Sequence, residues 1–258
     1  MGQYCSLPLM DVFSMRPDRY RTLEEGLDIA PAGPDSRFLE IACGDGKAAV
    51  WFADKFGADV TGVDLSEKRI AAARELAAGR GTESAPEFIC GDFFSMTADE
   101  KYTHIYCEDF FSSLDEEHKR RFAGRVSELL RPGGHLILCD FAVGKGGCED
   151  ERVQIDNIPC FVGIKKPETY CGYFEQAGLA AAAVRDRSLR LYSLGAYLAK
   201  SYGVKVTELG NVLAGVESVE KNLSPAELEA DGTEKQKKIN NFFVNARIAW
   251  LLMIFEKM

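Results

Sequence analysis

The sequence predicts an α/β fold in which a mainly parallel sheet is covered by helices on both faces. Three observations indicate this class. Apolar runs of strand length alternate with segments whose apolar residues recur every three or four positions. A glycine-rich turn and a following acid bracket the first of these units. A run of large apolar residues at 246–255 predicts one further strand.

The unit over residues 37–64 is the centre of this prediction. Its first apolar run carries one acid, Glu40, and is followed by a turn that contains Gly44 and Gly46. The next segment predicts a helix that stops at Gly57, with its apolar side formed by Ala49, Val50, Phe52, Ala53 and Phe56. A second apolar run ends on Asp64. This order of elements is typical of a site for a nucleoside-bearing ligand.

Two ligand classes fit this unit. Glycine at positions 44 and 46 lets the backbone approach a ligand closely, and Asp64 can accept hydrogen bonds from both ribose hydroxyls. The pattern Gly44-x-Gly46-x-x-Ala49, with Asp64 further on, satisfies the dinucleotide fingerprint. Taken alone, this pattern is a weak signal, and it keeps an NAD-dependent oxidoreductase as an alternative function.

The stretch Glu40-Ile-Ala-Cys-Gly-Asp-Gly46 also resembles motif I of the class I S-adenosylmethionine (SAM) methyltransferases. Ala42 stands where that motif usually has its first glycine, and we expect the small alanine to be tolerated. The resemblance implies SAM as cofactor and S-adenosylhomocysteine (SAH) as product. It assigns Glu40, Ala42, Gly44, Gly46 and Asp64 to cofactor binding. A non-catalytic SAM-binding regulatory protein is a further alternative, because the sequence presents no obvious base.

The later elements continue the alternation. Further strands are predicted at 87–90, 102–107, 135–140 and 180–185. Further helices are predicted at 67–78, 116–130 and 167–178, and Ser66 and Asp115 are placed to cap the first two of these. The sequence Arg131-Pro-Gly-Gly134 predicts a sharp turn that leads into the fifth strand.

The segment 105–141 resembles strand four through strand five of small-molecule N-methyltransferases, including the phosphoethanolamine and glycine-derivative types. The resemblance implies a Rossmann-like, seven-stranded, mainly parallel sheet of order 3-2-1-4-5-7-6 with helices on both faces. It also implies that the last strand is antiparallel and follows a helical insertion. In open α/β sheets, ligands bind outside the carboxyl ends of the strands.

The resemblance extends the set of cofactor residues. Leu65 is placed to lie against adenine, Asp92 to accept from the adenine amino group, and Phe93 to pack on the ring. Cys107, at the end of the fourth predicted strand, is assigned to the cofactor as well. The alternative interpretation makes Asp92 a cap or turn residue and Phe93 part of the core.

Asp109 is the acid best placed for the methyl acceptor, because it follows the fourth strand at the carboxyl edge. We expect it to orient the acceptor and to take a proton from it, which makes it the candidate catalytic residue. Phe110 and Tyr20 are predicted to contact the substrate. For Tyr20 the alternative is a helix, beginning near Asp18, that packs on the edge of the sheet.

Four regions are predicted along the chain. Residues 1–35 form an N-terminal capping segment, and 36–188 form the SAM-binding core. Residues 189–244 form a helical insertion with several amphipathic segments, one of which begins at the capping box Ser224-Pro-Ala-Glu227. Residues 245–258 return as the last strand.

Composition narrows the partners. The chain is 46% hydrophobic and 28% charged, with a net charge of −9 and no block dense in lysine or arginine. This favours a small-molecule acceptor over nucleic acid, which a basic face would attract. No apolar run reaches the length of a membrane span. The oligomeric state, monomer or homodimer, stays open.

Eight cysteines are scattered along the chain, several of them in predicted strands, which predicts reduced thiols and a cytoplasmic location. The start of the chain lacks a secretory signal, although Met1-Gly2-x-x-x-Ser6 formally matches a myristoylation motif. No metal site is predicted. A thiol cluster of Cys148, Cys160 and Cys171 is a minor alternative, because their spacing matches no known metal pattern.

Overall fold

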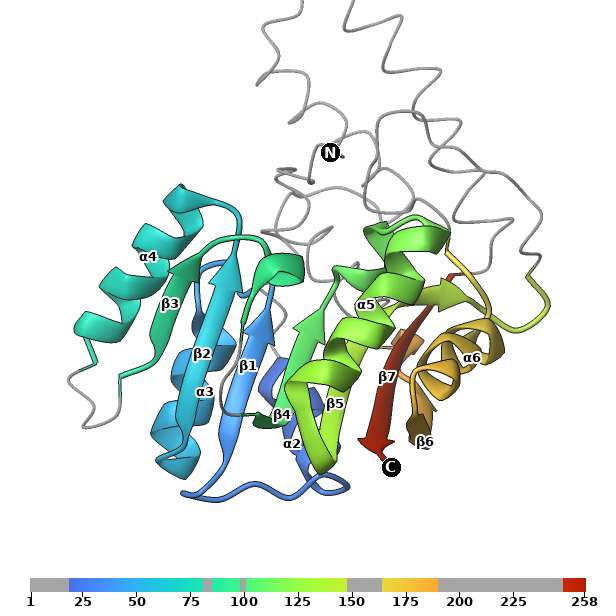
Figure 1. Ribbon diagram of the computed structural model, residues 1–258, viewed down its shortest axis with the longest axis horizontal. Helices are drawn as coiled ribbons and strands as arrows, with labels where there is room; N and C mark the ends of the chain where they lie inside the picture. The colour runs from blue at the N-terminus through green and yellow to red at the C-terminus, as the bar shows by residue number, and fades with distance from the viewer. Residues whose placement is uncertain (1–18, 81–84, 98–100, 148–163, 190–247) are drawn as a thin grey trace, which may run out of the picture.

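The computed structural model describes residues 19–80, 85–97, 101–147, 164–189 and 248–258 (Figure 1). Within these ranges the strands form one seven-stranded sheet of order β3-β2-β1-β4-β5-β7-β6, which confirms the predicted order. The strands are β1 (Arg37–Ile41), β2 (Asp59–Asp64), β3 (Glu87–Cys90), β4 (Tyr102–Glu108), β5 (Leu130–Val143), β6 (Leu179–Asp186) and β7 (Ile248–Lys257).

The first five strands are parallel, and β7 runs antiparallel to both of its neighbours. Phe141, near the end of β5, pairs with Trp250, near the start of β7. The antiparallel direction therefore brings the first residues of the last strand to the edge where the parallel strands end. This edge is the one at which α/β sheets bind ligands.

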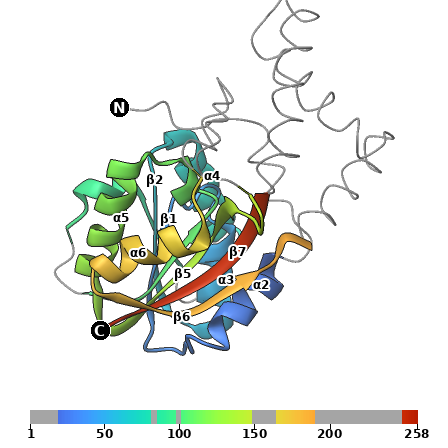
Figure 2. The same cartoon turned by 90° about the vertical axis from the view of Figure 1, so that its right-hand side faces the viewer.

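Helices cover both faces of the sheet, which Figure 2 shows in a view along the edge of the sheet. One hydrophobic cluster joins the sheet to α2 (Arg19–Leu27), α3 (Lys47–Phe56) and α4 (Glu67–Ala78). A second cluster joins the other face to α5 (Glu116–Leu129) and α6 (Pro167–Gln176). A separate apolar layer therefore covers each face of the sheet, as is usual for parallel sheets, which are buried on both sides.

The predicted helix ends are confirmed in detail. Ser66 Oγ accepts a hydrogen bond from the Arg69 amide at 3.3 Å and caps α4. Asp115 Oδ1 accepts one from the His118 amide at 2.8 Å and caps α5. Gly57 ends α3 with φ of 62°, a left-handed conformation in which glycine has no steric penalty.

The fifth strand differs from the prediction of 135–140. It begins at Leu130, which pairs with Tyr102, and the next pairing joins His135 to His104. Residues 131–134, with Gly133 at φ of 70°, interrupt the pairing opposite Thr103, so the predicted sharp turn is present inside the strand. The strand also continues to Val143 because β7 supplies pairing partners there.

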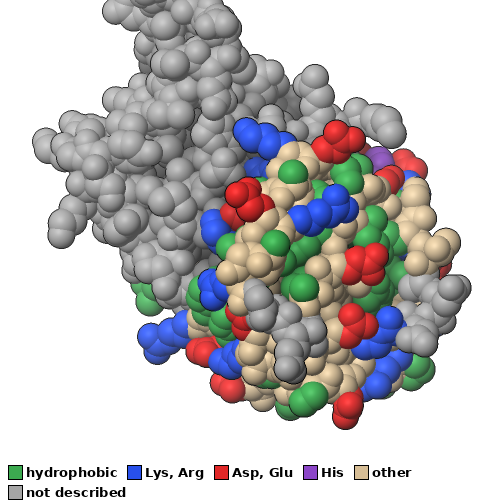
Figure 3. Space-filling view, turned by 90° about the vertical axis from the view of Figure 1, so that its left-hand side faces the viewer, with side chains coloured by type: hydrophobic (Ala, Val, Ile, Leu, Met, Phe, Trp, Pro, Cys, Tyr) green, Lys and Arg blue, Asp and Glu red, His purple; other side chains and the backbone are tan. Residues whose placement is uncertain are grey.

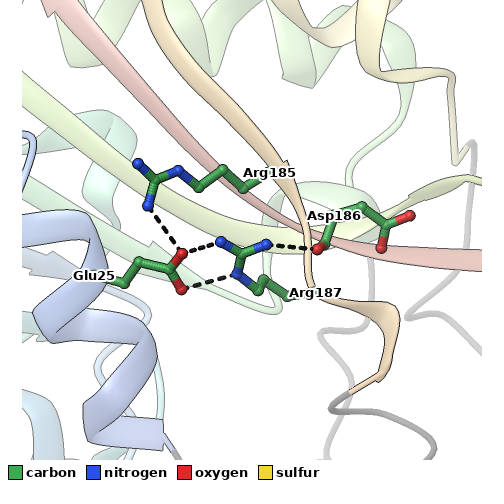
Figure 4. A network of polar contacts seen from close by, with 4 residues as sticks. All are labelled: Glu25, Arg185, Asp186 and Arg187. Carbon is green, nitrogen blue, oxygen red and sulfur yellow. Dashed lines mark hydrogen bonds and ion pairs between the residues drawn. The ribbon is translucent and has the colours of Figure 1, made fainter.

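The helix α2 lies on the face of the sheet and not on its edge. A Cβ placed on Gly26 would lie 3.1 Å from Ile137 of β5 and 3.4 Å from Ile254 of β7, so a glycine allows this close approach. Figure 4 shows how α2 is also tied to the end of β6. Glu25 accepts hydrogen bonds from Arg185, at 2.9 Å, and from two nitrogens of Arg187. Paired bonds of this kind fix orientation as well as distance.

The predicted helical insertion over 189–244, with its capping box at 224–227, lies outside the described residues apart from Leu189. So do the first eighteen residues, Cys148 and Cys160. The division into four regions therefore stays a prediction. No helix in the described ranges has the length and apolar character needed to cross a membrane.

His104 gives the fold a predictable sensitivity to acid. Its side chain is 4% exposed and stacks on Phe38, with ring centroids 4.6 Å apart. Burial, followed by the nearby His135, lowers the pKa of His104 to about 4. Below about pH 6.5 the His104 imidazole therefore binds a proton in the unfolded chain, whereas in the folded chain it stays neutral until the pH nears its lowered pKa. We expect the free energy of unfolding to fall by about 2 kcal/mol between pH 7 and pH 5 from this residue.

Urea unfolding at the two pH values measures this effect. His104→Phe keeps an aromatic ring against Phe38 but cannot bind a proton, so most of the difference between pH 7 and pH 5 is expected to disappear. An equal loss of stability in wild type and variant would show that other groups cause the acid sensitivity.

Candidate active site

Four loops meet at the carboxyl edge of the sheet, at the top of Figure 1. They follow β1, β2, β3 and β4. Strands β1 and β4 lie side by side although the chain forms β2 and β3 between them, so the strand order reverses at this point. Such a switch point opens a crevice between two loops that leave in opposite directions.

Glu40 holds the first helix to this edge. Its side chain is 2% exposed, and Oε2 accepts a hydrogen bond from the Ala49 amide at 2.7 Å. Ala49 lies in the first turn of α3, where backbone amides have no partner within the helix and where a negative charge is stabilised by the helix dipole. The acid in β1 thus sets the position of the helix. Its contact with the cofactor stays a prediction.

The loop after β1 has left-handed backbone at Ala42, Gly44 and Gly46, with φ of 55°, 55° and 73°. A Cβ on Gly46 would lie 2.6 Å from the Phe88 ring and 2.8 Å from Ala73. Gly46 is therefore required for packing between α3, α4 and β3, in addition to any role toward a ligand. The sequence pattern identified the glycine but not this reason for it.

Ala42 occupies the left-handed region without being glycine, which costs about 1–2 kcal/mol. Ala42→Gly should remove this strain, against an added entropy cost of about 0.5–1 kcal/mol in the unfolded chain. We expect the free energy of unfolding, measured in urea, to rise by up to about 1 kcal/mol. The matched control is Ala72→Gly, in the exposed middle of α4, which should lower it by about 1 kcal/mol. A destabilised Ala42→Gly variant would contradict the argument.

Asp64 ends β2 beside the glycine loop. Its Oδ2 accepts a hydrogen bond from the Gly44 amide at 3.0 Å, and its Oδ1 accepts one from the Ser66 amide at 2.9 Å. A carboxylate has about four acceptor positions, so each oxygen can also accept from a ribose hydroxyl. Leu65 follows and is 44% exposed, which leaves an apolar surface next to the carboxylate. These residues fit the ribose and adenine of the predicted cofactor.

The structure shows contacts of Asp92 and Phe93 within the fold itself. Asp92 Oδ1 accepts a hydrogen bond from the Phe94 amide at 3.0 Å and caps a short 3₁₀ helix, η1 (Phe93–Ser95). Phe93 is buried against Phe94 and Phe122 in the second hydrophobic cluster. These contacts are the ones that the alternative interpretation described. Contact of either residue with adenine stays a prediction.

The assignment of Cys107 to the cofactor is not supported. Its side chain has 0% exposure and lies among the core residues of the second cluster, where burial raises the pKa of its thiol. The reason is that side chains alternate between the two faces of a strand, so the Cys107 side chain lies on the face of the sheet that α5 covers. The first half-exposed residue of β4 is Glu108.

Asp109 lies directly after β4, at the switch point, with φ of 52°. Its amide donates to the Cys139 carbonyl at 2.9 Å, and its Oδ1 accepts from the indole nitrogen of Trp250 at 2.9 Å. Among the described residues, Ala42 and Asp109 are the non-glycine residues with positive φ. Strained backbone of this kind is concentrated at functional sites.

Phe110 is half-buried and contacts Phe122, with ring centroids 6.2 Å apart. Tyr20 is exposed and stacks on Trp51 of α3 at 5.4 Å. This stacking supports a structural role for Tyr20 between α2 and α3. The roles of both residues toward a substrate stay predictions.

A buried polar cluster beneath the loop after β4 was missed in the sequence. The Asp140 carboxylate, at 0% exposure, accepts hydrogen bonds from the amides of Ser112, at 3.0 Å, and Phe141, at 2.7 Å. The buried Lys119 amine donates to the carbonyls of Ser112 and Leu114. Burial lowers the pKa of Lys119 to about 8 and raises the pKa of Asp140. The cluster therefore holds the loop that carries Asp109.

Trp250 was also missed. Within a long apolar run it resembled another core residue, and its strand was expected only to complete the sheet. The antiparallel direction of that strand was the available signal, since it brings position 250 to the ligand edge. Within the described ranges, no three His, Cys, Asp or Glu side chains form a group suited to a metal ion.

Comparisons with known proteins agree with this geometry. Residues 38–134 match a family described as "Methyltransferase domain". A methyltransferase from Streptomyces halstedii, GfsG, is 29% identical over 194 residues, which cover 73% of this chain and 67% of that protein. A phosphoethanolamine N-methyltransferase from Triticum aestivum is 26% identical over 168 residues. That match covers 65% of this chain but only 32% of the wheat protein.

Among solved structures, the chain is similar to phosphoethanolamine N-methyltransferase 2 from Haemonchus contortus, in complex with phosphomonomethylethanolamine and S-adenosylhomocysteine. The TM-score is 0.67 at 18% sequence identity, over 93% of this chain and 52% of that chain. Similarity at this level of identity establishes a shared fold. This chain thus spans about half of that structure and about a third of the wheat relative.

Proposed function

Because the chain belongs to the class I S-adenosylmethionine-dependent methyltransferases, we propose that it methylates a small molecule held at the carboxyl edge of the sheet. The comparisons do not favour the NAD-dependent oxidoreductase that the glycine pattern alone predicted. One observation carries the proposal: Asp109 is fixed at the switch point through both its backbone and its side chain. Ligands of α/β sheets bind at such a switch point, and on this ground the proposal puts the acceptor beside Asp109.

The residues of the first two loops are suited to hold SAM. In the proposal, Asp64 accepts from the ribose hydroxyls, Leu65 covers one face of the adenine, and the 42–46 loop lies along the remainder of the molecule. When bound, SAM supplies a methyl group on a positively charged sulfur, the hard part of the chemistry. The protein has to align the acceptor with that methyl and exclude water.

Asp109 is proposed to act on the acceptor. A carboxylate in this position accepts a hydrogen bond from the nucleophilic N–H or O–H, which turns its lone pair toward the methyl carbon. As the new bond to carbon forms and the bond from carbon to sulfur breaks, the acceptor's proton passes to the Asp109 carboxylate. General-base assistance contributes about 10²–10⁴-fold in typical enzymes. Phe110, beside it, would form part of the apolar wall.

The charge of the protein supports a small cationic or amine acceptor over nucleic acid. The net charge is −9. On the face shown in Figure 3, lysine and arginine side chains alternate with aspartate and glutamate over the described residues. Methyltransferases of this fold act on nitrogen, oxygen, sulfur and carbon, so the nucleophilic atom is left to experiment. Free thiols at Cys43, Cys107 and Cys139, all buried, support a reducing, cytoplasmic location.

Two measurements test the proposal. Calorimetric titration of the whole chain with SAH, beside NAD⁺, is expected to give micromolar binding of SAH and no binding of NAD⁺. Incubation with SAM and a panel of small amines, alcohols and carboxylic acids, followed by mass spectrometry, is expected to give a product heavier by one methylene. SAH binding without any product would favour the regulatory alternative, and binding of NAD⁺ alone would overturn the cofactor assignment.

A further inference from the structure

Asp109 follows the fourth strand and Trp250 lies in the last one, 141 residues later in the chain, and these two strands do not touch. Strand β5 lies between β4 and β7. The contact nevertheless forms because the indole of Trp250 reaches from the start of β7 to the residue after β4. The distance from Nε1 to Oδ1 is 2.9 Å, which is a normal length for an N–H donor and a carboxylate.

The indole of Trp250 is buried, and hydrogen bonds hold the backbone that carries it. Its side chain is 1% exposed. The Trp250 amide donates to Ser188 Oγ at 3.1 Å, and its carbonyl accepts from the Arg187 amide at 2.8 Å. Arg187 in turn donates two hydrogen bonds to Glu25 of α2 (Figure 4). These bonds fix the backbone of Trp250, and the indole itself is packed in the first hydrophobic cluster.

Asp109 has little freedom of its own. Its backbone is set by the left-handed φ of 52° and by the hydrogen bond from its amide to Cys139. The direction of the carboxylate then depends on two side-chain torsions, and the contact with the indole selects among them. A donor that binds one carboxylate oxygen also favours the charged form, which is the form that can accept a proton.

On this geometry, and resting on the proposed role of Asp109, we propose that Trp250 is a positioning residue for methyl transfer. Its indole N–H holds the Asp109 carboxylate in the orientation that the acceptor requires. The last strand of the sheet thereby contributes to the reaction as well as to the fold. A phenylalanine at position 250 would fill most of the same space but would lack the N–H donor. Trp250→Phe therefore separates the contribution of the hydrogen bond from that of packing.

The first test observes the hydrogen bond without any turnover. The chain has two tryptophans, so ¹⁵N-tryptophan labelling gives two indole N–H signals, and Trp250→Phe identifies which one belongs to Trp250. In Asp109→Asn, the Trp250 signal is expected to shift because the acceptor loses its charge, while the Trp51 signal stays in place. An unmoved Trp250 signal would overturn the proposal.

The second test is kinetic and uses the acceptor found in the screen. Trp250→Phe is expected to lower kcat about tenfold, leave SAH affinity unchanged, and move the acid limb of the kcat profile to higher pH. In the Asp109→Asn background the same substitution should cost nothing further, because the group it positions has lost its charge. Phe255→Leu, a fully buried change at the far end of β7, controls for general loosening and should leave the pH profile unaltered.

The outcomes separate the two proposals. A wild-type protein that binds SAH but methylates no acceptor would overturn the proposed function. An active wild type whose Trp250→Phe variant keeps its kcat and pH profile would overturn the positioning role alone. An equal loss in the wild-type and Asp109→Asn backgrounds would do the same, since it would show that Trp250 acts independently of Asp109.

Discussion

Asp109→Asn is expected to lower kcat about a hundredfold while SAH affinity stays within about twofold of wild type. The substitution keeps the shape of the side chain, and asparagine tolerates the left-handed backbone that Asp109 adopts. Its amide oxygen can still accept from the Trp250 indole. What is lost is the charge and the ability to take a proton, which typically accounts for about 10²–10⁴-fold in rate. Steady-state kinetics and calorimetry with SAH measure the two effects separately.

Asp115→Asn is the matched control, because it removes one negative charge from the same loop and keeps the cap of α5. It should leave kcat unchanged. If Asp109→Asn retained full turnover, Asp109 would not be the base. If SAH binding fell with turnover, the residue would belong to the cofactor site.

Asp64→Ala is expected to weaken SAH binding by about a hundredfold. The carboxylate is proposed to accept from both ribose hydroxyls, and hydrogen bonds to a charged group are each worth about 1.5–3 kcal/mol. The substitution also leaves the amides of Gly44 and Ser66 without their carboxylate acceptor, so the loop that would hold the cofactor should loosen. Calorimetric titration with SAH measures the loss.

Asp59→Ala is the control, since it removes a carboxylate from the other end of the same strand. Asp59 is exposed and forms a surface ion pair with Arg37, which contributes little stability. The SAH affinity of the Asp59→Ala variant should equal that of the wild type. Wild-type affinity in Asp64→Ala would remove Asp64 from the cofactor site, and urea unfolding of both variants would show whether any loss reflects a general loosening of the fold.

The strain in the active site has a consistent location. Ala42 follows β1 and Asp109 follows β4, and these strands are neighbours at the switch point. Each residue carries a left-handed backbone conformation; Asp109 is held by hydrogen bonds to β5 and β7, and the residue after Ala42 donates its amide to the Val63 carbonyl of β2. A strained backbone that its surroundings hold in place, at the edge where ligands bind, keeps a site ordered before the ligand arrives.

Much of the fold was predictable because its causes are local. The spacing of apolar residues identified the strands and helices, and Ser66, Asp115 and Gly57 marked helix ends through bonds that span a single turn. The strand order came from the resemblance to the methyltransferases. The prediction failed where a partner strand decides the outcome, as in β5, which β7 extends beyond the expected end.

For the candidate site, too, some features were predictable from the sequence and others were not. The residue pattern was enough to predict Asp64 and Asp109 as acids that follow or end parallel strands, because strand alternation and a closing acid are local features. Only the tertiary structure showed that the Cys107 side chain is buried, that Gly46 packs against Phe88, and that Trp250 holds Asp109. The physical reason is distance along the chain. A residue's neighbours within one turn are set by the backbone, whereas a contact across 141 residues exists only once the sheet has placed β4 and β7 on either side of β5.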